Sequence, residues 1–445
     1  MSASSPESVD VHVIPRSPTV SAYAWYVLVV LTLTNIVGAV DRFMMGILVV
    51  PLKGAMHLTD TELGLLQGMG FALLYSLAGL PCGRLADRID RRLMIAVGCL
   101  AWTVATAACA FANSFATLFV ARVFVGLGEA TLLPAAMSLL GAYFPRERIG
   151  LSTGVFVVGS SLGKAIAFIG GGALLGLLAA AGGIAVMGRH FEPWQALFLA
   201  AALPGILTTV LCFTMREPAR APGEGGRSSS LRDLWEHVWG RRAAFGLFVV
   251  AATCVVTVGI LFAAWAPSFF VRQFGLGISN AAMLVGVTAL IVSPIGAVVG
   301  GQITDALARR GLRTGPLTVL TLALCVIAPA SYVAFVFSDN LALSVAAYGL
   351  AQATVLASGP QCYAGLQSMT PMRHRGTVSA TFLALTTLTS LGFGVPVIGM
   401  LSDYAFNGGD NSLGLSLFTA IGSLSVLGVW IGVIARRPVA KAGFA

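Results

Sequence analysis

Long apolar stretches separated by short polar segments run through almost the whole chain. Twelve of them approach or exceed about 20 residues, the length a helix needs to cross roughly 30 Å of hydrocarbon. We therefore predict an all-α integral membrane protein with twelve transmembrane helices. The predicted spans cover residues 24–52, 61–83, 93–112, 115–143, 149–181, 193–214, 243–271, 279–304, 315–337, 341–369, 376–404 and 413–435.

The polar segments distribute positive charge unevenly between the two sides of the predicted membrane. Of the 27 Lys and Arg residues, 21 fall on the side that holds both termini, three fall on the other side, and three lie inside helices. Cytoplasmic loops carry the excess of Lys and Arg in membrane proteins. We therefore expect a multi-pass protein with cytoplasmic N- and C-termini, in a bacterial inner membrane.

Two polar loops repeat the same spacing, which is glycine, three residues, aspartate, three residues and two arginines. They lie at residues 83–92 and 301–310, with a constant offset of 218. A repeat of this kind predicts two six-helix halves, as in transporters that bind substrate between duplicated halves. The expected organisation is an N-terminal tail (1–22), a first bundle (23–215), a cytoplasmic linker (216–241), a second bundle (242–437) and a tail (438–445). Within the linker, residues 231–239 are a candidate interfacial helix.

Composition restricts the class of protein further. Hydrophobic residues make up 57% of the chain and charged residues 10%, against roughly 45–50% and about 25% in soluble domains. The net charge is +9, but the basic residues lie between apolar runs and form no basic face. We therefore expect no nucleic-acid partner. No phosphate-binding loop, set of metal ligands or nucleophile-and-base pair is visible, so we expect neither an enzyme nor a cofactor or metal.

The first repeated loop carries a family resemblance. Residues Gly83 to Arg92 read GRLADRIDRR, which resembles the signature loop of the major facilitator superfamily. Arg122 with Gly126 and Gly128 resembles the helix 4 motif of that superfamily. Asp90 departs from the pattern, since the superfamily usually has glycine there, and the turn is therefore expected to differ slightly. The resemblance spans nearly the whole chain and implies the major facilitator fold.

Shorter motifs resemble the spinster-like transporters within that superfamily. They are the Asp41-Arg42 pair in the first predicted helix and the run from Gly126 to Ala130, which reads GLGEA. The resemblance implies proton-linked movement of lysophospholipids or sphingoid lipids. It also implies small amphiphilic substrates, protons and membrane lipids as partners, and we expect a monomer.

Five charged residues lie inside predicted helices, where each costs about 2.5–3.5 kcal/mol on insertion scales unless it is paired or faces water. Counting 1.5 Å per residue places Asp41 and Arg122 at similar depth, so the two can meet, with Glu129 nearer the midplane. A midplane carboxyl with no evident partner favours a proton carrier. Arg42 points away from Asp41, either toward Glu129 or toward the outer gate. The predicted proton-coupling residues are Asp41, Glu129, Arg122 and Arg42.

The fifth charge, Lys164, follows Ser160 and Ser161 by about one helical turn. It can hold a phosphate or carboxylate of the substrate, pair with a carboxylate, or extend to an interface. All five charges lie in the first half, while the second half offers uncharged polar side chains, an asymmetry suited to an amphiphile. The predicted substrate-binding residues are Lys164, Ser160, Ser161, Trp265, Gln361 and Tyr363.

The duplicated loops are also candidates for a cytoplasmic latch between the halves. Their aspartates can pair with arginines and helix ends. Alternatively, the arginines of these loops only provide the positive charge that is typical of cytoplasmic loops. The predicted latch residues are Gly83, Asp87, Arg88, Arg91, Arg92, Asp305 and Arg309.

Taken together, the patterns predict a proton-coupled secondary active transporter that works by alternating access on a lipid-like amphiphile. A proton symporter or antiporter of a small organic anion or a hydrophobic drug-like compound is the alternative. Mostly apolar second-half helices disfavour a sugar, which needs hydrogen-bond partners on both walls of its site.

Overall fold

The computed structural model describes residues 20–145, 147–186, 188–218, 231–310, 312, 314–409 and 411–442. Within them, eleven helices are long and apolar enough to cross a membrane. The second crossing is divided at Gly68 into α2 (Asp60–Gln67) and α3 (Met69–Ala86). With it, the structure accounts for the twelve predicted crossings, whose centres agree with the sequence prediction.

The remaining helices of the first half follow in chain order. They are α1 (Ala22–Met56), α4 (Arg91–Cys109), α5 (Phe115–Glu129), α6 (Leu132–Tyr143), α7 (Ile149–Ala165), η1 (Ile166–Gly171), α8 (Gly172–Ala180) and α9 (Pro193–Thr214). Several crossings therefore consist of two or three segments.

The second half begins after the linker helix α10 (Leu231–Gly240). Its elements are α11 (Arg242–Phe274), α12 (Ile278–Arg309), α13 (Gly315–Tyr332), η2 (Val333–Phe337), α14 (Leu341–Ser368), η3 (Met372–His374), α15 (Arg375–Thr387), η4 (Leu388–Gly394), α16 (Val395–Met400), η5 (Leu401–Ala405) and α17 (Ser412–Lys441). Helix α10 lies where the sequence predicts an interfacial helix. Residues 219–230 of the predicted linker and most of the N-terminal tail lie outside the described residues.

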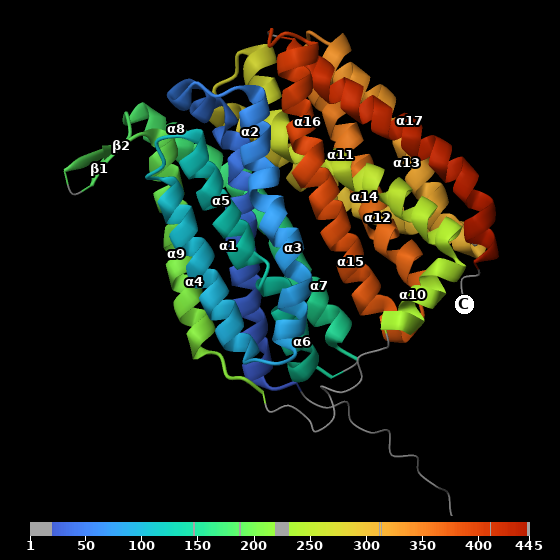
Figure 1. Ribbon diagram of the computed structural model, residues 1–445. Coiled ribbons are helices and arrows are strands. Elements are labelled where there is room, and N and C mark those ends of the chain that lie inside the picture. The colour runs from blue at the N-terminus through green and yellow to red at the C-terminus, as the bar shows by residue number, and fades with distance from the viewer. Residues whose placement is uncertain are drawn as a thin grey trace, which may run out of the picture.

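The two halves stand side by side as helical bundles (Figure 1). A short antiparallel hairpin, β1 (Ile184–Val186) and β2 (Arg189–Phe191), leaves the first bundle beside α8, at the same end of the molecule as α2 (Figure 1). We call this end of the molecule the hairpin side. The other end, which holds α10 and the start of α15, is the linker side. The sequence analysis missed the hairpin because each strand has only three residues, too few for an alternating pattern to stand out.

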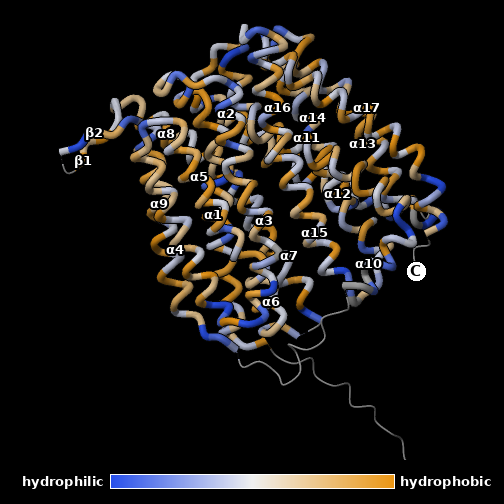
Figure 2. Tube along the Cα trace, in the orientation of Figure 1, coloured by the Kyte–Doolittle hydropathy of each residue, from blue (hydrophilic) through white to orange (hydrophobic). Residues whose placement is uncertain are grey.

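Hydropathy follows the geometry of the bundles. Apolar residues cover the helix shafts, and the hydrophilic positions gather toward the two ends (Figure 2). Many large apolar side chains on the outer faces are exposed, among them Leu177, Leu203 and Val426. Large exposed apolar faces fit a hydrocarbon surrounding rather than water.

The halves approach each other most closely at the hairpin side, where α2 packs against α16. Glycines make this approach possible. A Cβ atom at Gly68 would overlap the carbonyl oxygen of Leu391, and one at Gly399 would overlap the carbonyl oxygen of Asp60. The backbones of the two halves are therefore in direct contact at this end.

Candidate functional site

Asp41 and Arg122 form a buried ion pair between α1 and α5. The Nη1 atom of Arg122 donates to Oδ1 of Asp41 at 3.0 Å, and the hydroxyl of Thr106 on α4 donates to Oδ2. Arg122 is 0% exposed and Asp41 is 3% exposed. The contact expected from the depths of these two residues is present, and it ties three helices of the first half together.

Glu129, for which the sequence suggested no partner, is paired with Arg42. The Nη2 atom of Arg42 donates to Oε2 of Glu129 at 2.5 Å, so of the two directions open to Arg42 the structure shows the one toward Glu129. The guanidinium also stacks on the rings of Phe71 and Tyr75 of α3, at 4.8 and 5.3 Å from their centroids. Gly38 of α1 lies against the Glu129 carboxyl, and a Cβ there would be 3.4 Å from it, within ordinary contact distance.

The four charged residues form what we call the central cluster: Asp41, Arg42, Arg122 and Glu129. Its hydrogen bonding is incomplete. Oε1 of Glu129, Nε of Arg42, and Nε and Nη2 of Arg122 are buried and have no hydrogen-bond partner among the described residues. Buried polar groups are nearly always bonded. The central cluster therefore retains capacity to bind a proton or a polar ligand group.

Lys164 of α7 lies outside this cluster and has a different environment. Its Nζ atom is 5.5 Å from the centroid of the Phe43 ring, the residue after Arg42. No ion pair of Lys164 with a described residue is present, so of its three predicted roles the structure gives no support to pairing with a carboxylate. Ser161 is exposed and Ser160 is half-buried on the same helix, while Gly159 and Gly163, on either side of the serines, pack on α1.

The predicted binding residues of the second half differ in whether their polar groups are available to a ligand. Trp265 is fully buried and donates its indole N–H to the carbonyl of Val395 at 3.2 Å, so it does not present that donor to a ligand in this state. Gln361 is 4% exposed and its Oε1 atom has no partner among the described residues. Tyr363 packs on Phe382, with ring centroids 5.4 Å apart. Gln361 and Tyr363 therefore remain candidates on the second wall.

Several hydroxyls on the second half are occupied by their own helices. Thr257, Ser293, Ser358 and Thr381 each donate to the carbonyl four residues earlier. Such bonds satisfy the hydroxyl locally. The second wall is thus less polar than its composition suggests, which strengthens its contrast with the charged first half.

The predicted latch loops lie at the linker side. Asp87 ends α3 and is exposed, as are Arg88, Asp305 and Arg309, and a Cβ at Gly83 would meet no atom within 4 Å. Arg91 is 6% exposed and pairs with Glu217 at 2.7 Å. Arg92 donates to the carbonyl of Met215 at 3.3 Å and contacts Asp90 at 3.4 Å. Arg91 thus holds the start of the linker, and Arg92 holds the end of α9, so neither contact joins the two halves.

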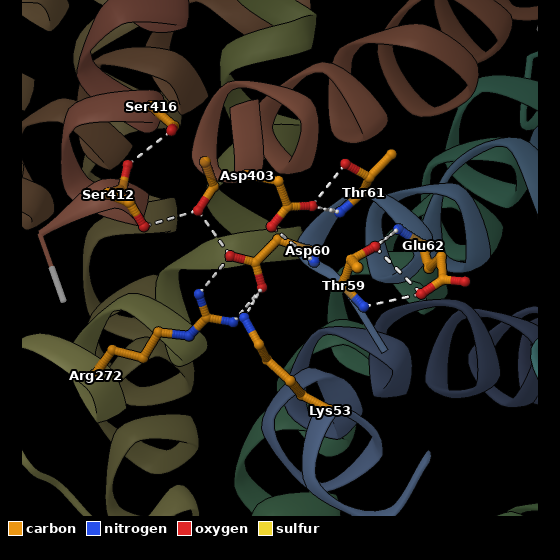
Figure 3. A network of polar contacts seen from close by, with 10 residues as sticks. Lys53, Thr59, Asp60, Thr61, Glu62, Arg272, Asp403, Ser412 and Ser416 are labelled. Carbon is orange, nitrogen blue, oxygen red and sulfur yellow. Dashed lines mark hydrogen bonds and ion pairs between the residues drawn. The ribbon is translucent and has the colours of Figure 1, made fainter. Parts of the chain in front are cut away.

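The hairpin side holds a cluster of charges that sequence reasoning did not identify as a site. Figure 3 shows the Asp60 carboxylate between Lys53 and Arg272. Lys53 lies 2.6 Å from Oδ1, and Arg272 binds both oxygens, at 2.6 and 2.7 Å. Ser402 donates to Oδ2 at 2.7 Å. Asp60 is 0% exposed.

A second aspartate, Asp403, completes this cluster from the other half. It accepts bonds from the backbone N–H of Thr61 at 2.7 Å, from the Thr61 hydroxyl at 2.7 Å and from the N–H of Asp60 at 3.2 Å. Asp403 therefore holds the first turn of α2, where carboxylates are favoured by unpaired N–H groups and the helix dipole. We call Lys53, Asp60, Thr61, Arg272, Ser402 and Asp403 the hairpin-side cluster.

The environment of Asp60 keeps it ionised. Burial alone would raise the pKa of its carboxyl, but the bonds and charge of Arg272, with further bonds from Lys53 and Ser402, hold the pKa well below its usual range. The two cations and the Ser402 hydroxyl therefore favour the ionised form of Asp60.

The contacts between the two halves in the hairpin-side cluster join residues that are far apart in the sequence. Asp60 and Arg272 are 212 positions apart, and Thr61 and Asp403 are 342 apart. Lys53 and Arg272 were visible as two of the few basic residues on the sparsely charged side, which was the available signal. Thr106, Phe71 and Tyr75 carried no signal, since each is an ordinary residue of an apolar helix.

Comparison with known proteins agrees with this architecture. The model of the Major Facilitator Superfamily matches residues 31–394. An "MFS-type efflux pump" of Mycolicibacterium smegmatis is 28% identical over 408 residues, 91% of each chain. A hexuronate transporter of Bacillus subtilis is 23% identical over 432 residues, 93% of this chain and 98% of the relative.

A solved structure shares the fold over nearly the full length. The inward-facing, unoccupied structure of a bacterial homolog to the human lysosomal transporter Spinster superposes with a TM-score of 0.82 and 24% identity, over 96% of this chain and 99% of that one. The matched family model covers well over half of the sequence. The chain therefore belongs to the major facilitator superfamily, and it is a multi-pass membrane transporter rather than an enzyme.

Proposed function

We propose that the protein is a proton-coupled secondary transporter that moves a lipid-like amphiphile by alternating access. The observation that carries this proposal is the central cluster. It places two ion pairs in the first half, with buried polar atoms that lack partners among the described residues, while the second half offers few available polar groups. A site with one charged and one apolar wall suits a substrate with one charged end and one apolar end.

Proton coupling follows from the pair between Arg42 and Glu129. A proton bound to Glu129 removes the counter-ion of Arg42, and the guanidinium then needs another anion. A phosphate or carboxylate on the substrate supplies it. Loss of the proton restores the original pair and releases the substrate. Binding of the proton and of an anionic substrate therefore favour each other.

Asp41 has a second role in this proposal. Its pair with Arg122 joins α1 to α5, so rocking that separates these helices exposes Asp41 to protonation. Lys164 and its serine neighbours would contact the polar end of the substrate, with Gln361 and Tyr363 on the second wall.

Orientation and gating complete the proposal. The positive-charge pattern favours a cytoplasmic linker side, with both termini in the cytoplasm, and we propose a bacterial inner membrane. The hairpin-side cluster then closes the outer face. Opening that face requires Asp60 to leave Arg272, because α2 belongs to the first half and α11 to the second. In the outward-open state, Asp87 and Asp305 would latch the cytoplasmic loops through arginines and helix ends.

A test uses the purified protein in sealed vesicles with an imposed pH gradient. Glu129→Gln mimics the protonated form, so we expect uphill accumulation of a labelled lysophospholipid to fall at least tenfold while passive exchange survives. Glu62→Gln is the matched control, because Glu62 caps α2 and Gln serves equally in a capping box. Accumulation by Glu129→Gln at the wild-type level would place the proton site elsewhere.

The alternative substrate is a small organic anion, and the hexuronate transporter relative favours it. The same vesicles distinguish the two classes. If glucuronate accumulates and the lysophospholipid does not, the central cluster serves a hydrophilic anion and the amphiphile is excluded.

A further inference from the structure

Helix α10 carries a pair of aromatic side chains that the core of the protein does not cover. Trp235 is 62% exposed and Trp239 is 53% exposed. The two indole rings stack, with centroids 5.2 Å apart and an angle of 21° between their planes. They occupy neighbouring positions one helical turn apart, so they form one continuous apolar surface.

The position of α10 relative to the membrane follows from the chain. Only Arg241 separates it from α11, the first crossing of the second half. Figure 1 shows α10 at the linker-side ends of the second-half helices. His237 fastens it there, with Nε2 lying 3.0 Å from the carbonyl of Met369 at the end of α14 and the ring packing on Phe245. The helix is therefore held at the level where α11 enters the hydrocarbon.

Two arginines lie beside the tryptophans. The guanidinium of Arg242 is 5.5 Å from the centroid of the Trp239 ring. Arg241, which is also exposed, lies 3.2 Å from His237. Stacking uses the face of a guanidinium and leaves its N–H edge available to a planar or tetrahedral anion. Among the described residues, Arg242 makes no ion pair.

Acidic residues also lie on α10. At 100° per residue Asp233 is well away from both tryptophans, while the exposed Glu236 lies about 60° from Trp239. The positive charge therefore lies at the α11 end of the aromatic surface, where Arg241 and Arg242 follow Trp239 and Arg242 contacts its ring. Tryptophan is the residue favoured at the membrane interface, where its ring lies among the headgroups, and arginine binds phosphate oxygens there.

We propose that the Trp235–Trp239 surface of α10, with Arg241 and Arg242, binds the phosphate headgroup and upper acyl chain of anionic phospholipids in the adjoining leaflet. The rings lie between the acyl chains at the interface, and the guanidinium groups donate to the phosphate. This inference does not depend on the transported substrate.

Quenching by brominated lipids tests the proposal in the full-length protein. The chain has 7 tryptophans, so the signal of the pair is the difference between wild type and a Trp235→Phe, Trp239→Phe variant. In vesicles containing phosphatidylglycerol and phosphatidylcholine, only one of the two lipids is brominated at a time. We expect the pair to be quenched at least threefold more strongly when phosphatidylglycerol carries the bromine at equal mole fraction.

The arginines are then varied separately. Arg241→Gln with Arg242→Gln should abolish the preference for phosphatidylglycerol while quenching by phosphatidylcholine remains. The matched control is Arg436→Gln with Arg437→Gln, another exposed arginine pair near the linker-side end of a crossing, which should leave the preference unchanged. Equal quenching by both lipids in the wild type would overturn the anionic selectivity. An absence of quenching by either lipid would show that the pair faces water or a protein partner and would overturn the proposal entirely.

Discussion

The hairpin-side cluster and the central cluster use the same types of residue, but they join different parts of the molecule. In the hairpin-side cluster, Asp60 of the first half is bound by Arg272 and Ser402 of the second. In the central cluster, both ion pairs lie within the first half. Both oxygens of Asp60 are bonded, whereas Glu129 has one oxygen without a partner among the described residues. A fully bonded cluster between halves holds a conformation, and an incompletely bonded cluster within one half can exchange partners.

The largest expected effect is that of Asp60→Asn, which tests whether the hairpin-side cluster holds the two halves together. It leaves Lys53 and Arg272 without their buried counter-ion, which costs about 3–5 kcal/mol, so we expect the hairpin side to open. The measurement is the labelling rate, from the hairpin side, of a cysteine replacing the buried Ser268 in a cysteine-free background. An unchanged rate would show that the glycine contacts alone keep this side closed.

Asp41→Asn probes the central cluster by the same logic. Arg122 would lose its counter-ion and remain fully buried, so we expect the free energy of unfolding to fall by about 3 kcal/mol. Thermal unfolding in detergent measures it. Asp90→Asn is the matched control, because Asp90 is the N-cap of α4 and Asn caps a helix equally well. Equal unfolding temperatures for the two variants would argue against a structural role of the Asp41 pair.

Lys164→Ala sharpens the comparison between charged groups that are paired and the one that is not. Because Lys164 has no carboxylate partner among the described residues, we expect it to be available to substrate. Affinity for a phosphate-bearing lysolipid should fall about tenfold, or about 1.4 kcal/mol, while affinity for an uncharged amphiphile of equal chain length is retained. Equal losses for both ligands would assign Lys164 to packing on Phe43.

The smallest expected effect is an absence of change with pH at the hairpin side. A carboxyl whose pKa is depressed in the folded state stabilises that state fully above its ordinary value of about 3.9, and the contribution is lost only as pH falls toward the depressed pKa. The labelling rate of the Ser268→Cys position, divided at each pH by the rate for the same cysteine in the unfolded protein to remove the pH dependence of the thiolate, should therefore be constant from about pH 5 to pH 8. A ratio that rises steadily with acidity across that range would contradict the environment assigned to Asp60.

Much of the fold could be predicted from the sequence, because membrane crossings require long apolar runs and loops carry an uneven charge. The contact between Asp41 and Arg122 could also be predicted, since depth along a helix is nearly linear in residue number. The partner of Glu129 was uncertain because rotation about the helix axis leaves two directions open to Arg42. The hairpin-side cluster could not be predicted from the sequence, because residues more than 200 positions apart meet only through the packing of the two halves.

The glycine contacts at the hairpin side have a consequence for experiments that need one conformation. A methyl group added at Gly399 would overlap the backbone of Asp60 and act as a wedge between the halves, yet it would change no charge and no hydrogen-bonding side chain. When the two halves separate at the hairpin side, this overlap is relieved. Gly399→Ala is therefore a route to a protein trapped with its hairpin side open, suitable for raising conformation-specific antibodies.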